Sequence, residues 1–278
     1  MNGIRVEGLT KAYRPLGKVR PVLKGIDLTI APGEVVGLIG PNGAGKTTLM
    51  SCIVGFLNAD AGSITIDGRS NDDLDVRRRT GFVPERMNFD RRATGRAFLR
   101  YMARLARVAD AEVRVEELLA RLQLADAAEK TLGQYSRGML QRVGMCQALV
   151  ANPDFLFLDE PTSGLDPNGV MLVREVIAEQ RARGAAVLLN SHQLAEVERV
   201  CDRVLFLSGG VVAQQETLRH LDSIPIAITL LGGAVERLTV ANDEEIAAAV
   251  RRLVESGADV IDVRKQTADL EQIFRSTS

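Results

Sequence analysis

A glycine-rich loop at residues 40–47 constrains this chain more than any other part of its sequence. The apolar run at 35–39 precedes it and predicts a strand buried on both faces of a parallel sheet. A helical run at 46–54 follows it. A loop that opens a helix points several backbone N–H groups at one place, and the helix dipole favours an anion there. The order of strand, loop and helix therefore predicts a phosphate-binding P-loop.

This loop follows the pattern G-x-x-x-x-G-K-[ST], in which each residue type suits the binding of phosphate or Mg²⁺. Gly43 and Gly45 leave room for the backbone to approach the phosphates. Lys46 supplies a positive charge for the β- and γ-phosphates, and Thr47 places a hydroxyl on Mg²⁺. The strand and helix on either side favour a nucleotide site over a simple glycine-rich turn. The residues predicted to bind nucleotide here are Gly40, Pro41, Asn42, Gly43, Ala44, Gly45, Lys46, Thr47 and Thr48.

Two carboxylates end a second apolar run, which predicts a strand at 155–158. Strands of open α/β sheets deliver ligand-binding groups at their carboxyl ends. Asp159 is predicted to hold Mg²⁺, and Glu160 to orient and deprotonate the attacking water. The alternative is a strand that merely ends in a polar turn, which the P-loop in the same chain disfavours.

The rest of the chain alternates between strand and helix patterns. Such alternation predicts a mainly parallel sheet covered by helices on both faces. Period-two runs near the start predict further strands, and helical spacing between about 83 and 141 predicts a helical insertion. After about 218 a small α+β appendage is expected, with Asn242 capping its helix. The predicted strands are 4–6, 26–30, 186–189, 204–207, 227–230, 238–240 and 260–263, and the predicted helices are 170–183, 193–200, 243–256 and a short one at the end of the chain.

Composition narrows the classes of function. The formal net charge of −1 gives no general attraction to nucleic acid, so no nucleic-acid partner is expected. Cys52, Cys146 and Cys201 lack CxxC spacing, which argues against a disulfide framework or a zinc site and fits a reducing compartment. No apolar run reaches the roughly 18 to 20 residues of a membrane-spanning helix, and the start of the chain lacks the apolar core of a signal peptide. A link to a membrane is therefore expected only through a partner.

Several motifs, in order over about residues 4–215, resemble those of the ATP-binding cassette (ABC) ATPase family. Tyr135-Ser136-Arg137-Gly138-Met139 resembles the family signature in a variant form. The segment 159–167 resembles the Walker B motif continuing into the D-loop, and 81–85 resembles the Q-loop region. Tyr13 resembles the aromatic residue that stacks on adenine, and His192 after Ser191 resembles the switch histidine.

The resemblance implies a P-loop NTPase of ABC type with an antiparallel β subdomain, a mainly parallel core sheet and a helical insertion. It implies that two copies sandwich ATP and Mg²⁺ head to tail, so that Ser136 and Gly138 of one copy cap the γ-phosphate held by the other. It implies catalytic roles for Lys46, Glu160 and His192. Further implied contacts are Tyr13 and Val22 with the nucleoside, Asp166 across the dimer interface, and Thr47, Glu85 and Asp159 with the metal.

Two departures from the family pattern are visible. Glu85 stands where the Q-loop usually carries glutamine, which adds a negative charge near ATP. Arg137 and Met139 stand where glycine and glutamine are commonest in the signature, although Ser136 and Gly138 are retained. These variants, with the appendage, resemble the ABC-2-type branch, mostly exporters, whose ATPase is a separate chain.

That branch implies an arrangement of domains and partners. An ABC ATPase domain is expected at 1–218, with its helical subdomain at about 84–142, and an accessory domain at 219–278. An integral membrane permease and a second copy of the ATPase are the implied partners. The chain would then be cytoplasmic and peripheral on the membrane, held there through the permease.

The helical insertion is rich in arginine. From 77 to 114 there are 11 arginines and four acidic residues, a local balance of 11 − 4 = +7. One interpretation is a solvated helix face, and the other is a surface that docks a membrane subunit near lipid headgroups.

Two other functions fit the sequence less well than that of a transporter motor. A soluble ABC ATPase acting on DNA or the ribosome usually carries two cassettes or a long coiled-coil insertion, and neither is visible. A P-loop GTPase would need an NKxD-like motif, which is missing, and would leave the signature unexplained.

Overall fold

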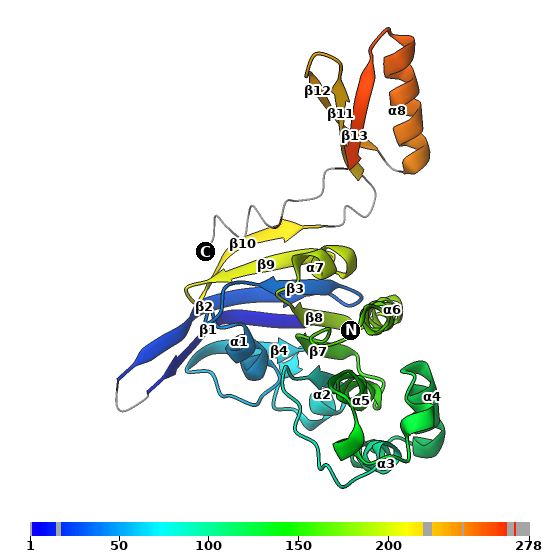
Figure 1. Ribbon diagram of the computed structural model, residues 1–278. Coiled ribbons are helices and arrows are strands. Elements are labelled where there is room, and N and C mark those ends of the chain that lie inside the picture. The colour runs from blue at the N-terminus through cyan, green and yellow to red at the C-terminus, as the bar shows by residue number, and fades with distance from the viewer. Residues whose placement is uncertain (1, 15–17, 219–223, 241, 266–269, 271–278) are drawn as a thin grey trace.

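The computed structural model describes residues 2–14, 18–218, 224–240, 242–265 and 270 of the 278-residue chain. The short helix expected at the end of the chain lies outside these residues. Most elements match the ranges that the sequence predicts, and their arrangement in space is shown in Figure 1.

The core is a six-stranded sheet, mostly parallel. Its strands, in order across the sheet, are β10 (Val211–Thr217), β9 (Arg203–Ser208), β3 (Val35–Ile39), β8 (Ala186–Asn190), β7 (Phe155–Asp159) and β6 (Thr80–Val83). Only β10 pairs antiparallel, with β9, in this sheet. The predicted α/β class with a mainly parallel core sheet is therefore confirmed.

The inner strands are apolar throughout because each faces an apolar core on both sides. In β7, Phe155 and Phe157 pack in the core that contains α1 (Lys46–Ile53), whereas Leu156 and Leu158 pack in the core that contains the other helices. Those helices are α5 (Arg137–Leu149), α6 (Pro167–Ala182) and α7 (Leu194–Val200). This double burial holds the carboxyl ends of β7 and β8, and the side chains there, in fixed positions.

An antiparallel sheet packs on the α1 side of the core sheet. Its strands, in order, are β2 (Arg20–Ile30), β1 (Ile4–Tyr13), β4 (Ala61–Ile66) and β5 (Arg69–Ser70). Buried residues of β1 and β2, such as Leu9 and Ile26, share a core with α1 and β3. The packing places the end of β1 and the start of β2 next to the glycine-rich loop.

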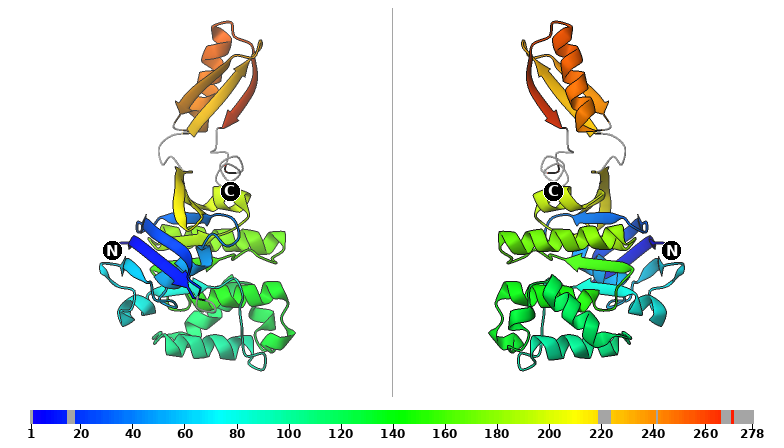
Figure 2. Two further views of the ribbon diagram at one scale, coloured as in Figure 1. Left: turned by 90° about the vertical axis from the view of Figure 1, so that its left-hand side faces the viewer. Right: turned by 90° about the vertical axis from the view of Figure 1, so that its right-hand side faces the viewer.

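The helical insertion forms a separate group beside β6 and β7, visible at the lower end of both views in Figure 2. It contains α3 (Gly95–Leu105), α4 (Ala111–Arg121), two short 3-10 turns, η2 (Ala125–Ala127) and η3 (Leu132–Gln134), and α5. The Thr94 side chain caps α3 by accepting a hydrogen bond from the Ala97 amide at 3.2 Å. The expected helical insertion is thus present.

The appendage is a three-stranded antiparallel sheet, in the order β12 (Val235–Val240), β11 (Ile224–Leu230) and β13 (Val260–Lys265), with α8 (Asp243–Glu255) packed on it. Asn242 caps α8 by accepting a hydrogen bond from the Glu245 amide at 2.9 Å. Ile226, Ile228 and Ala249 belong to its own small core. The appendage therefore has an apolar interior separate from the cores on the two faces of the six-stranded sheet.

Some elements are not anticipated by the sequence patterns. These are β4, β5, the short helix α2 (Leu74–Arg78), β6 and β10. β10 alternates between partly buried and exposed residues and forms a hairpin with β9 through Gly209 and Gly210. Such edge elements bury few side chains, so their sequences carry little apolar periodicity.

Candidate active site

A cavity of about 1030 Å³ opens at the carboxyl ends of the core strands. It brings together residues from distant parts of the sequence: the loop before α1, the end of β1, the start of β2, and the segments after β6, β7 and β8. The sequence-predicted residues that line it are Tyr13, Val22, Asn42, Gly43, Gly45, Lys46, Thr47, Thr48, Glu85, Glu160 and His192.

The glycine-rich loop is shaped by contacts with its own lysine. Lys46 Nζ donates to the Gly40 carbonyl at 2.6 Å and lies 3.2 Å from the Pro41 carbonyl, so the side chain closes the loop from within. Burial lowers the pKa of Lys46, and the charges of Glu160, Asp159 and Glu85 oppose that shift. The charge of the lysine is thus acted on by three carboxylates.

The glycines of the loop serve different purposes. Gly43 has φ of 83° and open space where a Cβ would stand, so this backbone is free to meet a ligand. At Gly45, with φ of 110°, a Cβ would lie 2.9 Å from Leu23 Cδ2. Gly45 therefore also allows β2 to pack against the start of α1, beyond the predicted room for phosphate.

Three of the predicted loop residues do not line the cavity. Gly40 and Pro41 supply the carbonyls that Lys46 binds, and a Cβ at Gly40 would lie 2.1 Å from the Leu207 carbonyl oxygen. Ala44 is buried in the core next to β2. These residues position the loop.

The two carboxylates at the end of β7 have different surroundings. Asp159, 1% exposed, pairs with Asn190 across β7 and β8, and the Asn190 amide donates to its carboxylate. Burial raises the pKa of Asp159, and hydrogen bonds from Asn190 and Thr47 oppose the rise. Asp159 is thus joined to the hydroxyl of Thr47, the other residue predicted to hold a metal.

These groups fit a magnesium ion better than a metal caged by protein alone. Within the described ranges no three His, Cys, Asp or Glu side chains gather as a metal cage. Mg²⁺ is commonly held by one or two carboxylates together with substrate phosphates and water. Thr47 and Asp159 offer a hydroxyl and a carboxylate beside the phosphate loop, and the charge of Glu85 acts on both Lys46 and Asp159.

Glu160 and His192 form a contact at the mouth of the cavity. Glu160 Oε2 lies 2.8 Å from His192 Nδ1, and the histidine side chain is 68% exposed while that of the glutamate is 11% exposed. Burial raises the pKa of Glu160, and the hydrogen bond with His192 opposes the rise. Glu160 also has φ of 51°, so the chain turns sharply after β7 and directs this carboxylate toward the ligand space.

Tyr13, the last residue of β1, also lines the cavity. Its hydroxyl lies 3.3 Å from Thr48 Oγ1, and 40% of the residue is exposed. Val22 lines the cavity beside it. An aromatic face and an apolar side chain here suit a planar base.

Four cavity residues are missed by the sequence patterns. Arg14 and Arg20 flank the ends of β1 and β2, where no motif marks them. Ser163 follows Glu160 by three positions, and Asn190 ends β8. Only Asn190 carries a sequence signal, since it is a polar residue at the carboxyl end of an apolar strand, as Asp159 is.

The signature residues lie outside this cavity. Ser136 caps α5 by accepting a hydrogen bond from the Met139 amide at 3.2 Å, and Gly138 lies in the first turn of that helix. Asp166 caps α6 by accepting a hydrogen bond from the Gly169 amide at 2.9 Å. One chain therefore presents the phosphate loop and the signature as two separate features.

Comparison with known proteins gives a consistent result. The ABC transporter family matches residues 23–163. An ABC transporter ATP-binding protein of Synechocystis is 40% identical over 247 residues, 85% of this chain and 70% of that protein. The daunorubicin resistance ATP-binding protein of Streptomyces coeruleorubidus is 34% identical, covering 98% of this chain and 94% of its own length. A fluoroquinolones export ATP-binding protein of Mycobacterium tuberculosis is 37% identical over 78% of this chain and 72% of its own.

Solved structures agree in fold. A bacterial ABC transporter cassette in dimeric form superposes with a TM-score of 0.72 at 27% identity, covering 78% of this chain and 99% of that one. The same cassette in a post-hydrolysis state with ADP and Pi gives a TM-score of 0.71. No helix in the described part of this chain combines the length and apolar character needed to cross a bilayer. The chain belongs to the ABC transporter family, as one of its ATP-hydrolysing subunits.

Proposed function

We propose that this chain drives export through a separate membrane permease, and that two copies close on ATP and separate after hydrolysis. The observation that carries the proposal is the division of the catalytic groups: Lys46 and Glu160 meet in one cavity, while Ser136 caps a helix outside it. A second copy that faces this cavity with its own α5 completes the site. The relatives named for daunorubicin resistance and fluoroquinolone export support export as the direction.

Within each cavity, Mg²⁺ would be held by Thr47 and Asp159, with Glu85 beside them, and when bound it neutralises charge on the phosphates. Lys46 and the amides of the loop bind the β- and γ-phosphates. Glu160 accepts a proton from the attacking water, and His192, in contact with Glu160, holds that carboxylate toward the γ-phosphate. Tyr13 and Val22 receive the nucleoside.

An apolar groove beside the active site is the proposed permease contact. Its volume is about 820 Å³, and Phe56, Leu74 and Leu105, each about two-thirds exposed, line it. Exposed apolar patches of this kind mark sites of protein association. Glu85 lines both this groove and the ATP cavity, so a short permease helix seated here would touch a residue of the ATP site directly.

The basic balance of the helical insertion is reduced by folding. Seven of its arginines form ion pairs, mostly with acidic residues outside the 77–114 window: Arg77, Arg78, Arg79, Arg96, Arg100, Arg104 and Arg114. In the part of the chain that the structure describes, Arg86, Arg91, Arg92 and Arg107 form none. Of these four arginines, Arg86 lines the groove. A positive charge without an ion pair therefore supports docking at this residue, and not over a broad basic surface.

The proposal includes a division of the chain into an ATPase domain at 1–218 and an accessory domain at 219–278. The separate core of the appendage supports this division. The permease would hold the whole assembly on the cytoplasmic face of the membrane.

The test of the ATP-driven dimer is Glu160→Gln. Loss of the base should stop turnover while ATP still binds, so the variant should form a dimer that depends on ATP in size-exclusion chromatography. Glu244→Gln, an exposed change in α8, should behave as the unmodified chain. A Glu160→Gln variant that turns over ATP fully and stays monomeric would refute the proposal.

The test of the docking groove is the pair of changes Phe56→Asp and Leu105→Asp. Charge in the groove should abolish copurification with the cognate permease and leave the ATPase activity of the isolated chain unchanged. Val113→Asp, at a residue 59% exposed outside the groove, is the matched control. Unchanged recovery of the permease with both groove variants would exclude this surface.

A further inference from the structure

The first turn of α5 is tied to the loop that follows Glu160. Arg137 Nη2 donates to Ser163 Oγ at 2.7 Å. One turn further along the same helix, Gln141 Nε2 donates to the Glu160 carbonyl at 3.4 Å, and Gln141 is 7% exposed. Residues four apart lie on the same helix face, so this face of α5 contacts both ends of the segment 160–163.

The loop is built to receive the arginine. Gly164 has φ of 75°, and a Cβ there would lie 2.6 Å from Arg137 Nε and 2.7 Å from its Cδ. Only a residue without a side chain lets the guanidinium rest on this backbone. The Ser163 amide also donates to the Glu160 carbonyl at 3.1 Å, so a hold on Ser163 acts on the turn that positions Glu160.

The guanidinium of Arg137 donates to Ser163, and within the described part of the chain no carboxylate forms an ion pair with it. Its neighbour Ser136 is the cap of α5 and is exposed, while Ser163 lines the ATP cavity of its own chain. Arg137 therefore connects a helix end that faces outward with the catalytic loop that faces inward. Glycine, the commonest residue here in the resembling signature, has no side chain to make the connection.

We propose that Arg137 is a positioning residue that couples the two ATP sites of the dimer. When the α5 N-terminus of one copy meets the γ-phosphate of its partner, the guanidinium transmits the displacement to Ser163 and so to Glu160 of its own site. This inference rests on the proposed head-to-tail dimer. Binding of ATP at one site thereby fixes the base at the other, and hydrolysis becomes cooperative in ATP.

The test compares Arg137→Ala, Ser163→Ala and the double variant by ATPase rate against ATP concentration. Each single change should bring the Hill coefficient from above 1 to about 1 and lower kcat about tenfold, with the Kd for ATP unchanged. The double variant should lose no more cooperativity and no more kcat than either single variant, because both changes remove the same contact. Arg137→Lys, which keeps one donor, should recover part of the cooperativity, and Arg104→Ala, an arginine 73% exposed in the same subdomain, should change nothing.

Each other outcome overturns the coupling. A Hill coefficient that stays above 1 in Arg137→Ala would show that Arg137 does not couple the two sites. A loss of cooperativity in Arg137→Ala, with no loss in Ser163→Ala, would mean that the guanidinium acts directly on the γ-phosphate bound by the partner copy. The ATP-dependent dimer of Glu160→Gln is measured in parallel, so a failure of the dimer itself is distinguished from a failure of the coupling.

Discussion

At the scale of single residues, the cavity at the glycine-rich loop combines charged side chains with an aromatic one. The charges of Lys46, Asp159 and Glu160 act on one another, and burial lowers the pKa of the lysine and raises the pKa of both carboxyl groups. Tyr13 lines the cavity and, among the hydrogen bonds of the described residues, contacts only the hydroxyl of Thr48. We therefore expect the charged residues and Tyr13 to make separable contributions to ATP use.

Tyr13→Ala should raise the Kd for ATP about tenfold, because stacking of a base on an aromatic side chain contributes about 1–3 kcal/mol. kcat at saturating ATP should stay nearly unchanged, since the proposed role of Tyr13 is with the nucleoside and not with the phosphate groups. Tyr13→Phe keeps the ring and should bind ATP almost as well as the unmodified chain. Equilibrium binding of a fluorescent ATP analogue measures all three proteins. An unchanged Kd in Tyr13→Ala would remove Tyr13 from the nucleoside site.

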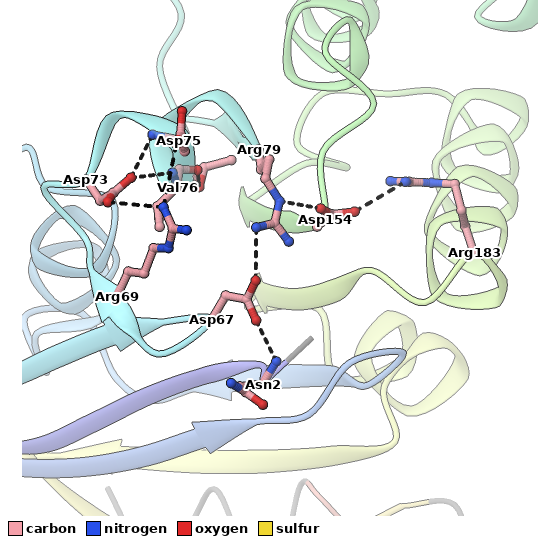
Figure 3. A network of polar contacts seen from close by, with 10 residues as sticks. Asn2, Asp67, Arg69, Asp73, Asp75, Val76, Arg79, Asp154 and Arg183 are labelled. Atoms are coloured by element: carbon pink, nitrogen blue, oxygen red, sulfur yellow. Dashed lines mark hydrogen bonds and ion pairs between the residues drawn. The ribbon is translucent and has the colours of Figure 1, made fainter.

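At the scale of elements, Arg79 joins the antiparallel sheet to the core sheet (Figure 3). Its guanidinium contacts Asp67, in the turn between β4 and β5, at 2.9 Å and Asp154, just before β7, at 2.6 Å. Asp67 also accepts a hydrogen bond from the Asn2 amide at 2.8 Å. The guanidinium lies 5.4 Å from the ring centroid of Phe155 as well. This network holds three segments from distant parts of the sequence together.

Asp67 should make the free energy of unfolding of the chain depend on pH in the acid range. The Asn2 amide and Arg79 lower the pKa of Asp67 in the folded state. Its contribution is therefore present above the unfolded value of about 3.9 and disappears as pH falls through the lower folded pKa. Asp67→Asn should be less stable than the unmodified chain at pH 6, and the difference should vanish at the acid end of a urea-unfolding series. Asp110→Asn, the same change of acid to amide at an exposed position, is the matched control.

At the scale of the whole molecule, the core of the ATPase fold includes a residue from beyond the appendage. Leu270 is 0% exposed and belongs to the apolar cluster that contains α5, α6 and β9, although 219–278 is the predicted accessory domain. The polypeptide thus leaves the ATPase fold after β10, forms the appendage, and contributes again to the first core. The stability of the two units is linked at this residue.

Leu270→Ala should lower the free energy of unfolding of the ATPase fold by about 2–4 kcal/mol, since a buried leucine is replaced by a cavity. Leu231→Ala, in the appendage at a residue 67% exposed, should change it by less than about 0.5 kcal/mol. Thermal unfolding with and without MgATP measures the effect, because ATP stabilises only the unit that binds it. An equal, small effect of both changes would show that Leu270 does not support the ATPase core.

Local sequence was sufficient for most of the fold. Buried strands such as β3, β7 and β8 are short apolar runs, and α8 has both a cap and helical periodicity. β4, β10 and α2 were not anticipated, since they depend on pairing and packing with segments far away. The arginine count of the insertion was misleading for the same reason: Arg96 pairs with Glu116 and Glu129, which lie outside the basic window.

The sequence by itself determined the family and predicted which residues carry the chemistry, because a phosphate loop, a carboxylate after a buried strand and a capped signature helix are each encoded within a few consecutive residues. Only the tertiary structure decided how these pieces are connected. The contact of Glu160 with His192, the hold of Arg137 on Ser163 and the place of Leu270 in the core all join residues at least 26 positions apart. The distances between such residues are set by the packing of strands and helices, and no local pattern encodes them.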